Sequence, residues 1–296
     1  MGIITETGWR DAQTEAIAQK VNRLPTLPLV VHRLLELVGR ERHSLPEIVH
    51  IVESDSSLTV KVLRVANSAA FSRGQQISTV SRAIIHLGEK MVIGIALGAC
   101  ASDLFARPLI GYESCAGEMW DHSLCCAIAT REIARYAATP LSTDLAFTGG
   151  LIHDIGKIII SEFLRGNAET LTQWCDTRRS ADFLAAESEL LGTDHCRIGA
   201  EMAAHWNLPQ ELCTVIRHHH HPSSAALKDR ALVAAVHTGD LLAMMAGQGT
   251  GADTLSYRLD EIVESFFKIG KDDLSRIILN VQLEFFRTRN AVFQSS

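Results

Sequence analysis

Apolar residues recur at intervals of three and four along almost the whole chain, which is the spacing of one face of an α-helix. The stretch LPLVVHRLLELVGR (27–40) shows this spacing, with a proline suited to a helix start and a glycine near its end. Strict alternation of apolar and polar residues is missing, and no Asn-Gly or Asp-Gly turn joins two apolar runs. The sequence therefore predicts an all-α protein, a bundle of several short helices joined by short loops.

The expected helices divide into two groups at a weak boundary around residues 106–112. We predict an N-terminal segment, two packed helical subdomains and a C-terminal helical extension, over residues 1–23, 24–107, 108–246 and 247–296. Residues 247–257 are expected to form a loop. Beyond 27–40, helices are expected to start near residues 45, 56 and 78 and to cover 89–105, 116–137, 142–163, 168–191, 194–206, 209–219, 229–246, 258–268 and 271–292.

The composition is that of an ordinary soluble globular protein, with 47% hydrophobic and 21% charged residues. A net charge of −6 gives no basic surface of the kind that binds nucleic acid. No apolar stretch approaches the ~20 residues of a membrane span, and the N-terminus lacks the pattern of a signal peptide. The seven cysteines are an odd number without CxxC pairs, which favours a reducing compartment. We therefore expect a cytoplasmic protein that binds neither nucleic acid nor membrane.

The stretch LIHDIGKIII (151–160) places adjacent ionisable residues, His153 and Asp154, in an otherwise apolar run. Burying an unpaired charge is costly, so these two side chains need partners, and a metal ion is one candidate. Lys157 follows Asp154 by three residues and His153 by four, so a helix would place all three on one face. There Lys157 could neutralise Asp154 or hold a phosphate group.

Other candidate ligands are spread over several of the expected helices. Eight of the thirteen histidines lie between residues 153 and 237. Glu118 precedes His122 by four residues, so both side chains would lie on one helix face. Histidine nitrogens and carboxylate oxygens together suit iron, manganese, nickel, cobalt or zinc, and two such ions can share a bridging carboxylate. The candidates are Glu118, His122, His153, Asp154, His195, the histidines of RHHHHP (217–222) and Asp240.

Plainer explanations exist for many of the histidines. We interpret His32, His50, His86 and His237 as structural, because a lone histidine usually packs in the core or lies at the surface. The four consecutive histidines could form a solvated helix end. Successive residues of a helix are 100° apart, so only two or three of the four can face one site.

Several motifs, in order, resemble those of the HDOD family, the HD-related output domain of bacterial signalling proteins. The resemblance covers about residues 24–245. It rests on LPTLPLVVHRLLELV (24–38), LPEIVHIVESDSSLTVKVLRVANSAAFS (45–72), ISTVSRAIIHLGEKMV (77–92), DHSLCCA (121–127), GGLIHDIGK (149–157), DHCRIGAEMAAHWNLP (194–209) and IRHHHHP (216–222).

The resemblance implies an all-helical, HD-like fold related to HD-type metal phosphohydrolases and to the HD-GYP cyclic-di-GMP phosphodiesterases. Many HDOD domains have lost metal ligands and are thought to act as signalling modules. By position, Glu118, His122, His153, Asp154, His195, His219, His220 and Asp240 resemble the full ligand series of the HD-GYP branch. The GYP loop itself is absent, since the chain continues PSSAALKD after His221.

Two functions follow from the resemblance, and we favour the first. It is a signalling module with a protein partner and a site for a divalent transition metal, with room for two ions. The alternative is a metal-dependent phosphohydrolase acting on a nucleotide or another phosphoester. Its catalytic residues would be Asp154, bridging two ions, and Lys157, stabilising negative charge. An oxygen-using di-iron site stays open on ligand types alone.

Overall fold

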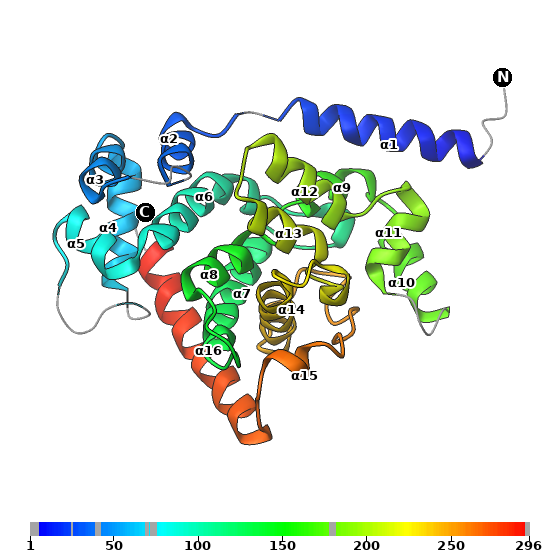
Figure 1. The fold of residues 1–296 in the computed structure, drawn as a ribbon. Helices are drawn as coiled ribbons and strands as arrows, with labels where there is room; N and C mark the ends of the chain where they lie inside the picture. The colour runs from blue at the N-terminus through cyan, green and yellow to red at the C-terminus, as the bar shows by residue number, and fades with distance from the viewer. Residues whose placement is uncertain are drawn as a thin grey trace.

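The structure is a computed structural model that describes residues 6–24, 26–38, 43–68, 71, 76–177 and 182–293. Helices make up its regular structure, and two isolated β-bridges are the only β-pairing among these residues. The all-α prediction is confirmed (Figure 1). The elements are α1 (Glu6–Asn22), α2 (Leu29–Val38), α3 (Leu45–Glu53), α4 (Ser56–Asn67), α5 (Val80–Leu87), α6 (Glu89–Phe105), η1 (Ile110–Tyr112), α7 (Glu118–Ala134), α8 (Thr143–Ile152), α9 (Lys157–Phe163), α10 (Ala168–Thr177), α11 (Phe183–Leu191), α12 (His195–His205), α13 (Gln210–His218), η2 (Pro222–Ser224), α14 (Arg230–Met245), α15 (Val263–Phe266) and α16 (Lys271–Phe293).

The N-terminal helices α2 to α5 pack together and against α6. Their buried face is aliphatic: Leu34, Ile48, Val62 and Ile84 are each at most 1% exposed. Helix α3 begins with a capping box, in which the Ser44 amide donates to the Glu47 carboxylate at 2.9 Å. Apolar burial on one side of each short helix therefore forms this subdomain.

Helix α7 is the centre of the second subdomain, where it packs closely against α8 and α14 (Figure 1). Small residues permit this approach. A Cβ added to Gly150 on α8 would lie 2.9 Å from the Ala127 Cα, and one on Gly239 of α14 would lie 2.9 Å from the Thr130 Cα. The close packing brings the inward-facing side chains of all three helices together.

The C-terminal helix α16 runs along α7 and also contacts α4 of the first subdomain. Arg131 on α7 forms an ion pair with Glu284, and Arg289 pairs with Asp121 at 2.7 Å. The helix thereby joins the two helical groups. No helix among the described residues combines the length and apolar character that crossing a membrane would need.

Three helix predictions were wrong in extent. The expected helix 142–163 is two helices, separated at residues 153–156 by a turn. The turn allows Gly156 to contact α12 directly, since an added Cβ there would lie 1.9 Å from the His195 carbonyl oxygen. The expected helix 168–191 is interrupted at Asp182, whose backbone is extended and whose side chain caps α11; residues 178–181 lie outside the described part of the chain. Of 258–268 only α15 is helical.

Candidate metal centre

Seven of the predicted ligand side chains meet in the interior of the second subdomain. They come from α7, from the turn between α8 and α9, from the start of α12, from the residues that follow α13, and from α14. None is more than 3% exposed. They are His122, His153, Asp154, His195, His219, His220 and Asp240. His153 and Asp154 lie in the turn between α8 and α9, and both are buried in the cluster.

Asp154 lies between two sets of histidines. Its Oδ1 is 3.4 Å from Nε2 of His195 and 3.3 Å from Nε2 of His219. Its Oδ2 is 3.4 Å from Nε2 of His153 and 3.8 Å from Nε2 of His122. Each carboxylate oxygen therefore faces a separate set of imidazoles, as a bridging ligand between two ions would.

Asp240 completes the first set and His220 the second. The Oδ1 atom of Asp240 is 3.2 Å from Nε2 of His122 and 3.7 Å from Nε2 of His153. The Nε2 atoms of His195 and His220 are 3.0 Å apart. Donor atoms within each set are close enough to bind a single ion.

Four of the histidines are oriented by hydrogen bonds from Nδ1. Nδ1 of His122 donates to the Gln248 carbonyl oxygen, and Nδ1 of His153 donates to the Gly150 carbonyl oxygen, both at 2.8 Å. In His219 it donates to the Ile216 carbonyl oxygen at 2.9 Å. In His195 it donates to the Glu187 carboxylate at 2.8 Å. The Nε2 lone pairs are thereby directed inward, which is how metal-binding imidazoles are held.

The cluster has the chemistry of a cation site. Nε2 atoms face each other at 3.3 Å in the pair His122 and His153, where lone pairs repel unless a proton or a metal ion lies between them. Within the described part of the chain, none of the four buried carboxylate oxygens of Asp154 and Asp240 has a hydrogen bond of regular geometry, although Oδ2 of Asp154 forms an ion pair with Lys157. Such groups are rare in proteins and costly, and a bound cation would satisfy them. The donor set therefore fits divalent transition metals.

Both carboxyl groups are ionised. Burial opposes ionisation of Asp154, but Lys157 and then His153 outweigh it and hold the pKa of Asp154 well below its usual range. Burial likewise opposes ionisation of Asp240, and hydrogen bonds with His122 and His153 hold its pKa well below the usual range. Two negative charges are thus concentrated among the imidazoles.

Lys157 lies beside this group and is fully buried. Its Nζ lies 2.6 Å from Oδ2 of Asp154 and 2.6 Å from Oδ2 of Asp253. Burial lowers the pKa of Lys157, but the two aspartates outweigh burial, so the net shift is upward and the ammonium is charged. It neutralises Asp154, one of the two roles expected from the sequence.

Glu118 does not join the cluster. It is exposed at the first turn of α7, where its carboxylate accepts hydrogen bonds from the Cys115 amide at 2.7 Å and from the Ser114 hydroxyl at 3.0 Å. Glu118 shares a helix face with His122 but does not reach the cluster, because α7 begins at Glu118 and its first turn lies at the surface.

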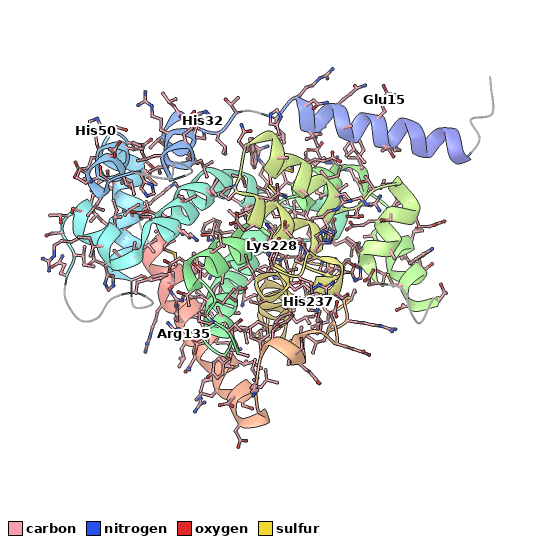
Figure 2. All side chains as sticks on the ribbon, viewed as in Figure 1. Glu15, His32, His50, Arg135, Lys228 and His237 are labelled. Atoms are coloured by element: carbon pink, nitrogen blue, oxygen red, sulfur yellow. The ribbon has the colours of Figure 1, made fainter. Side chains whose placement is uncertain are left out.

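The remaining histidines lie elsewhere. Figure 2 shows His32 and His50 on the outer side of the N-terminal helices. In the run of four histidines, His218 is half-buried and His221 is exposed. The Nε2 atom of His237, which is buried in α14, accepts a hydrogen bond from the Asp260 amide at 3.0 Å.

Four residues around the cluster were not found by sequence reasoning. Glu187 is fully buried and holds both the amide and the ring of His195. Cys196 Sγ lies 3.6 Å from Nδ1 of His219. Asp253 pairs with Lys157, and Tyr257 stacks on His220. An acid in the apolar run FLAAESELL was a usable signal for Glu187, whereas the loop residues Asp253 and Tyr257 gave none.

Comparison with known families identifies the domain that carries this cluster. The HDOD domain model matches residues 24–222, about two thirds of the chain. The chain belongs to the HDOD family. All of the cluster residues except Asp240 lie within the matched part of this HDOD protein. The predicted family resemblance is confirmed.

Individual relatives are distant. An uncharacterised protein of Treponema pallidum (strain Nichols) is 21% identical over 261 residues, which are 88% of this chain, and the chain spans about half the length (49%) of that curated relative. A Marinobacter aquaeolei VT8 structure, named as a proposed signal transduction protein, is 17% identical with a TM-score of 0.71, covering 96% of this chain and 66% of that one. A Shewanella amazonensis SB2B structure, named as a proposed metal-dependent phosphohydrolase, is 21% identical with a TM-score of 0.64, covering 94% and 98%. These likenesses establish the shared fold.

Proposed function

We propose that this HDOD protein is a bacterial signalling module, acting on a partner protein, whose buried cluster holds one or two divalent transition-metal ions. The observation that supports the metal is the position of Asp154. Its two oxygens face two separate sets of imidazoles, at 3.3–3.4 Å from the nearest Nε2 on each side.

The two sets define which residues would hold each ion. The first ion would be held by His122, His153 and Asp240 and the second by His195, His219 and His220, with Cys196 beside the second set and Asp154 facing both. Nitrogen and oxygen donors of this kind suit iron, manganese, nickel, cobalt or zinc. When bound, such ions supply Lewis acidity toward a phosphoryl oxygen.

Enclosure of the site favours the signalling function over catalysis. Every residue of the cluster is buried, and the segment 247–257 covers it. Substrates as large as a cyclic dinucleotide need an open cleft, whereas a closed metal site with its ligands satisfied is typical of a structural or regulatory role. A metal-dependent change in the packing of α7, α8 and α14 would then alter the surface that the partner contacts.

The phosphohydrolase alternative has one observation in its favour, the buried ammonium of Lys157 beside Asp154. A fixed positive charge next to two ions is suited to stabilising the negative charge of a phosphoryl group during its transfer. This function requires the covering segment to move.

Elemental analysis of gently purified protein tests the metal. We expect about one to two equivalents of transition metal in the native protein and less than about 0.1 equivalent in the double variant His153→Ala/Asp154→Ala. The matched control is His50→Ala, which removes an exposed histidine and leaves the metal content unchanged. Native protein with less than about 0.1 equivalent contradicts the proposal.

An activity screen separates the two functions. Metal-loaded protein is incubated with bis(p-nitrophenyl) phosphate and with cyclic dinucleotides. The signalling function predicts no metal-dependent turnover. Metal-dependent turnover that Lys157→Ala abolishes would establish the hydrolase instead.

A further inference from the structure

The segment 247–257 between α14 and α15 lies over the metal centre and follows the part of the chain that the family model matches. It has no helix, and its side chains alternate in exposure. Thr250, Asp253 and Tyr257 are buried, while Leu255 is 58% exposed. The segment is thus a strip of surface that directs three polar side chains down into the protein.

These inward contacts reach both ligand sets and the cation between them. The Gln248 carbonyl oxygen accepts from Nδ1 of His122 in the first set at 2.8 Å. The Tyr257 ring stacks on His220 of the second set, with centroids 3.7 Å apart and an interplanar angle of 11°. Asp253 binds Lys157 at 2.6 Å. One short segment therefore closes the whole centre.

Asp253 is held like a bound anion. Its Oδ2 accepts from the Lys157 ammonium at 2.6 Å and from the Tyr257 hydroxyl at 2.8 Å, and its Oδ1 accepts from the Thr250 hydroxyl at 2.7 Å. A lysine ammonium also binds a phosphoryl group as a point charge, and Lys157 would stay in place when the segment leaves. Lys157 is shared between two carboxylates at the same distance of 2.6 Å, Asp154 among the imidazoles and Asp253 on the covering segment.

The backbone of the segment is suited to leaving this position. Gly247 and Gly251 have φ values of +89° and +108°, and Leu255 has a φ of +58°. The left-handed conformation is unfavourable for a leucine, whose exposed side chain contributes little burial in return. Release of the segment would relieve this strain.

We propose that residues 247–257 form an internal acidic plug, in which the Asp253 carboxylate occupies on Lys157 the position of a phosphoryl oxygen. A ligand of the phosphate class reaches the metal centre only when the plug is displaced. The inference rests on the proposed metal site and adds the class of ligand and the element that controls its entry. If Asp253 were only a counter-ion of Lys157, it would not compete with a phosphate-class ligand for this position.

The test compares metal-loaded, full-length native protein with Asp253→Asn by calorimetric titration with inorganic phosphate. Asparagine keeps the shape, can accept from Tyr257 through its oxygen and donate to Thr250 through its amide nitrogen, and loses the charge opposite Lys157. Because a closed plug reduces the apparent affinity by the fraction of open protein, we expect phosphate to bind the variant at least about tenfold more tightly. The matched control is Glu264→Gln, an exposed acid on α15, which binds phosphate as the native protein does.

Hydrogen exchange gives a second measurement on the native protein. Saturating phosphate should accelerate exchange of the amides of residues 248–257, because the ligand displaces them.

If Asp253→Asn does not fold, Tyr257→Phe replaces it in the titration. This variant keeps the ring on His220, removes one hydrogen bond from Asp253, and should tighten phosphate binding by about threefold.

The outcomes separate the plug from the metal site, since metal content is measured for every protein. Native protein that holds metal, with a variant affinity within about twofold of native or no phosphate binding by either protein, overturns the plug alone. Native protein without metal overturns the proposed function and the plug with it.

Discussion

The two helical subdomains bury opposite kinds of side chain. In the N-terminal one the fully buried positions are aliphatic, such as Leu34 and Ile84, and His50 is exposed. In the second, the centre of the interior holds imidazoles, carboxylates and Lys157. Aliphatic burial stabilises a fold directly, whereas buried charges stabilise it little and are a common mark of functional sites. The first subdomain is therefore built for stability and the second for a site.

The largest loss of stability is expected at Gly156, where two backbone segments are in direct contact. Gly156→Ala places a Cβ 1.9 Å from the His195 carbonyl oxygen, so the α9 and α12 backbones must separate. We expect the free energy of unfolding to fall by about 4 kcal/mol in urea denaturation. Gly166→Ala, where φ is +80° and no atom lies within 4 Å of the added Cβ, should cost only about 1 kcal/mol. Equal effects would contradict the close-contact explanation.

A cavity in the N-terminal subdomain should affect stability alone. Leu34 is fully buried, so Leu34→Ala should lower the free energy of unfolding by about 3 kcal/mol. Metal content per folded molecule should not change, because the ligands lie in the other subdomain. Loss of metal from folded Leu34→Ala protein would show that the two subdomains are coupled.

Glu187→Gln should weaken metal binding and leave stability nearly unchanged, the reverse of Leu34→Ala. Glu187 holds the ring of His195 through Nδ1 at 2.8 Å, so the amide should weaken metal binding by about 10- to 100-fold with little change in stability. Competition with a chelator measures the affinity. Glu189→Gln, on the exposed side of the same helix, is the control and should bind as the native protein does. If Glu187→Gln binds metal with the native affinity, Glu187 contributes to packing and does not support the metal ligands.

The smallest change in metal affinity is expected for a substitution of Glu118. Its carboxylate hydrogen-bonds to the turn before α7 and lies outside the cluster. Glu118→Gln should therefore leave metal affinity within about twofold of the native value. A tenfold loss in the same chelator competition would return Glu118 to the ligand set.

Local pattern was sufficient for the residues that carry the site. His153 and Asp154 were found because two ionisable residues interrupt an apolar run, His122 because it lies in one of an ordered series of motifs, and Asp240 by its position in the resemblance to the HD-GYP ligand series. The same reasoning joined α8 and α9 into one helix, since the apolar spacing continues through 153–156. The contact between Gly156 and His195 that accompanies the break is absent from any local pattern.

By itself the sequence determined the helical class, the family and seven of the ionisable residues that gather in the interior, because helix periodicity and motif order are local properties. Only the tertiary structure decided that Glu118 stays outside, that Asp154 lies between two sets of imidazoles, and that Asp253 meets Lys157. The last pair is separated by 96 residues. Such contacts depend on how the packed helices place a loop, and the energy that selects them is spread over the whole core.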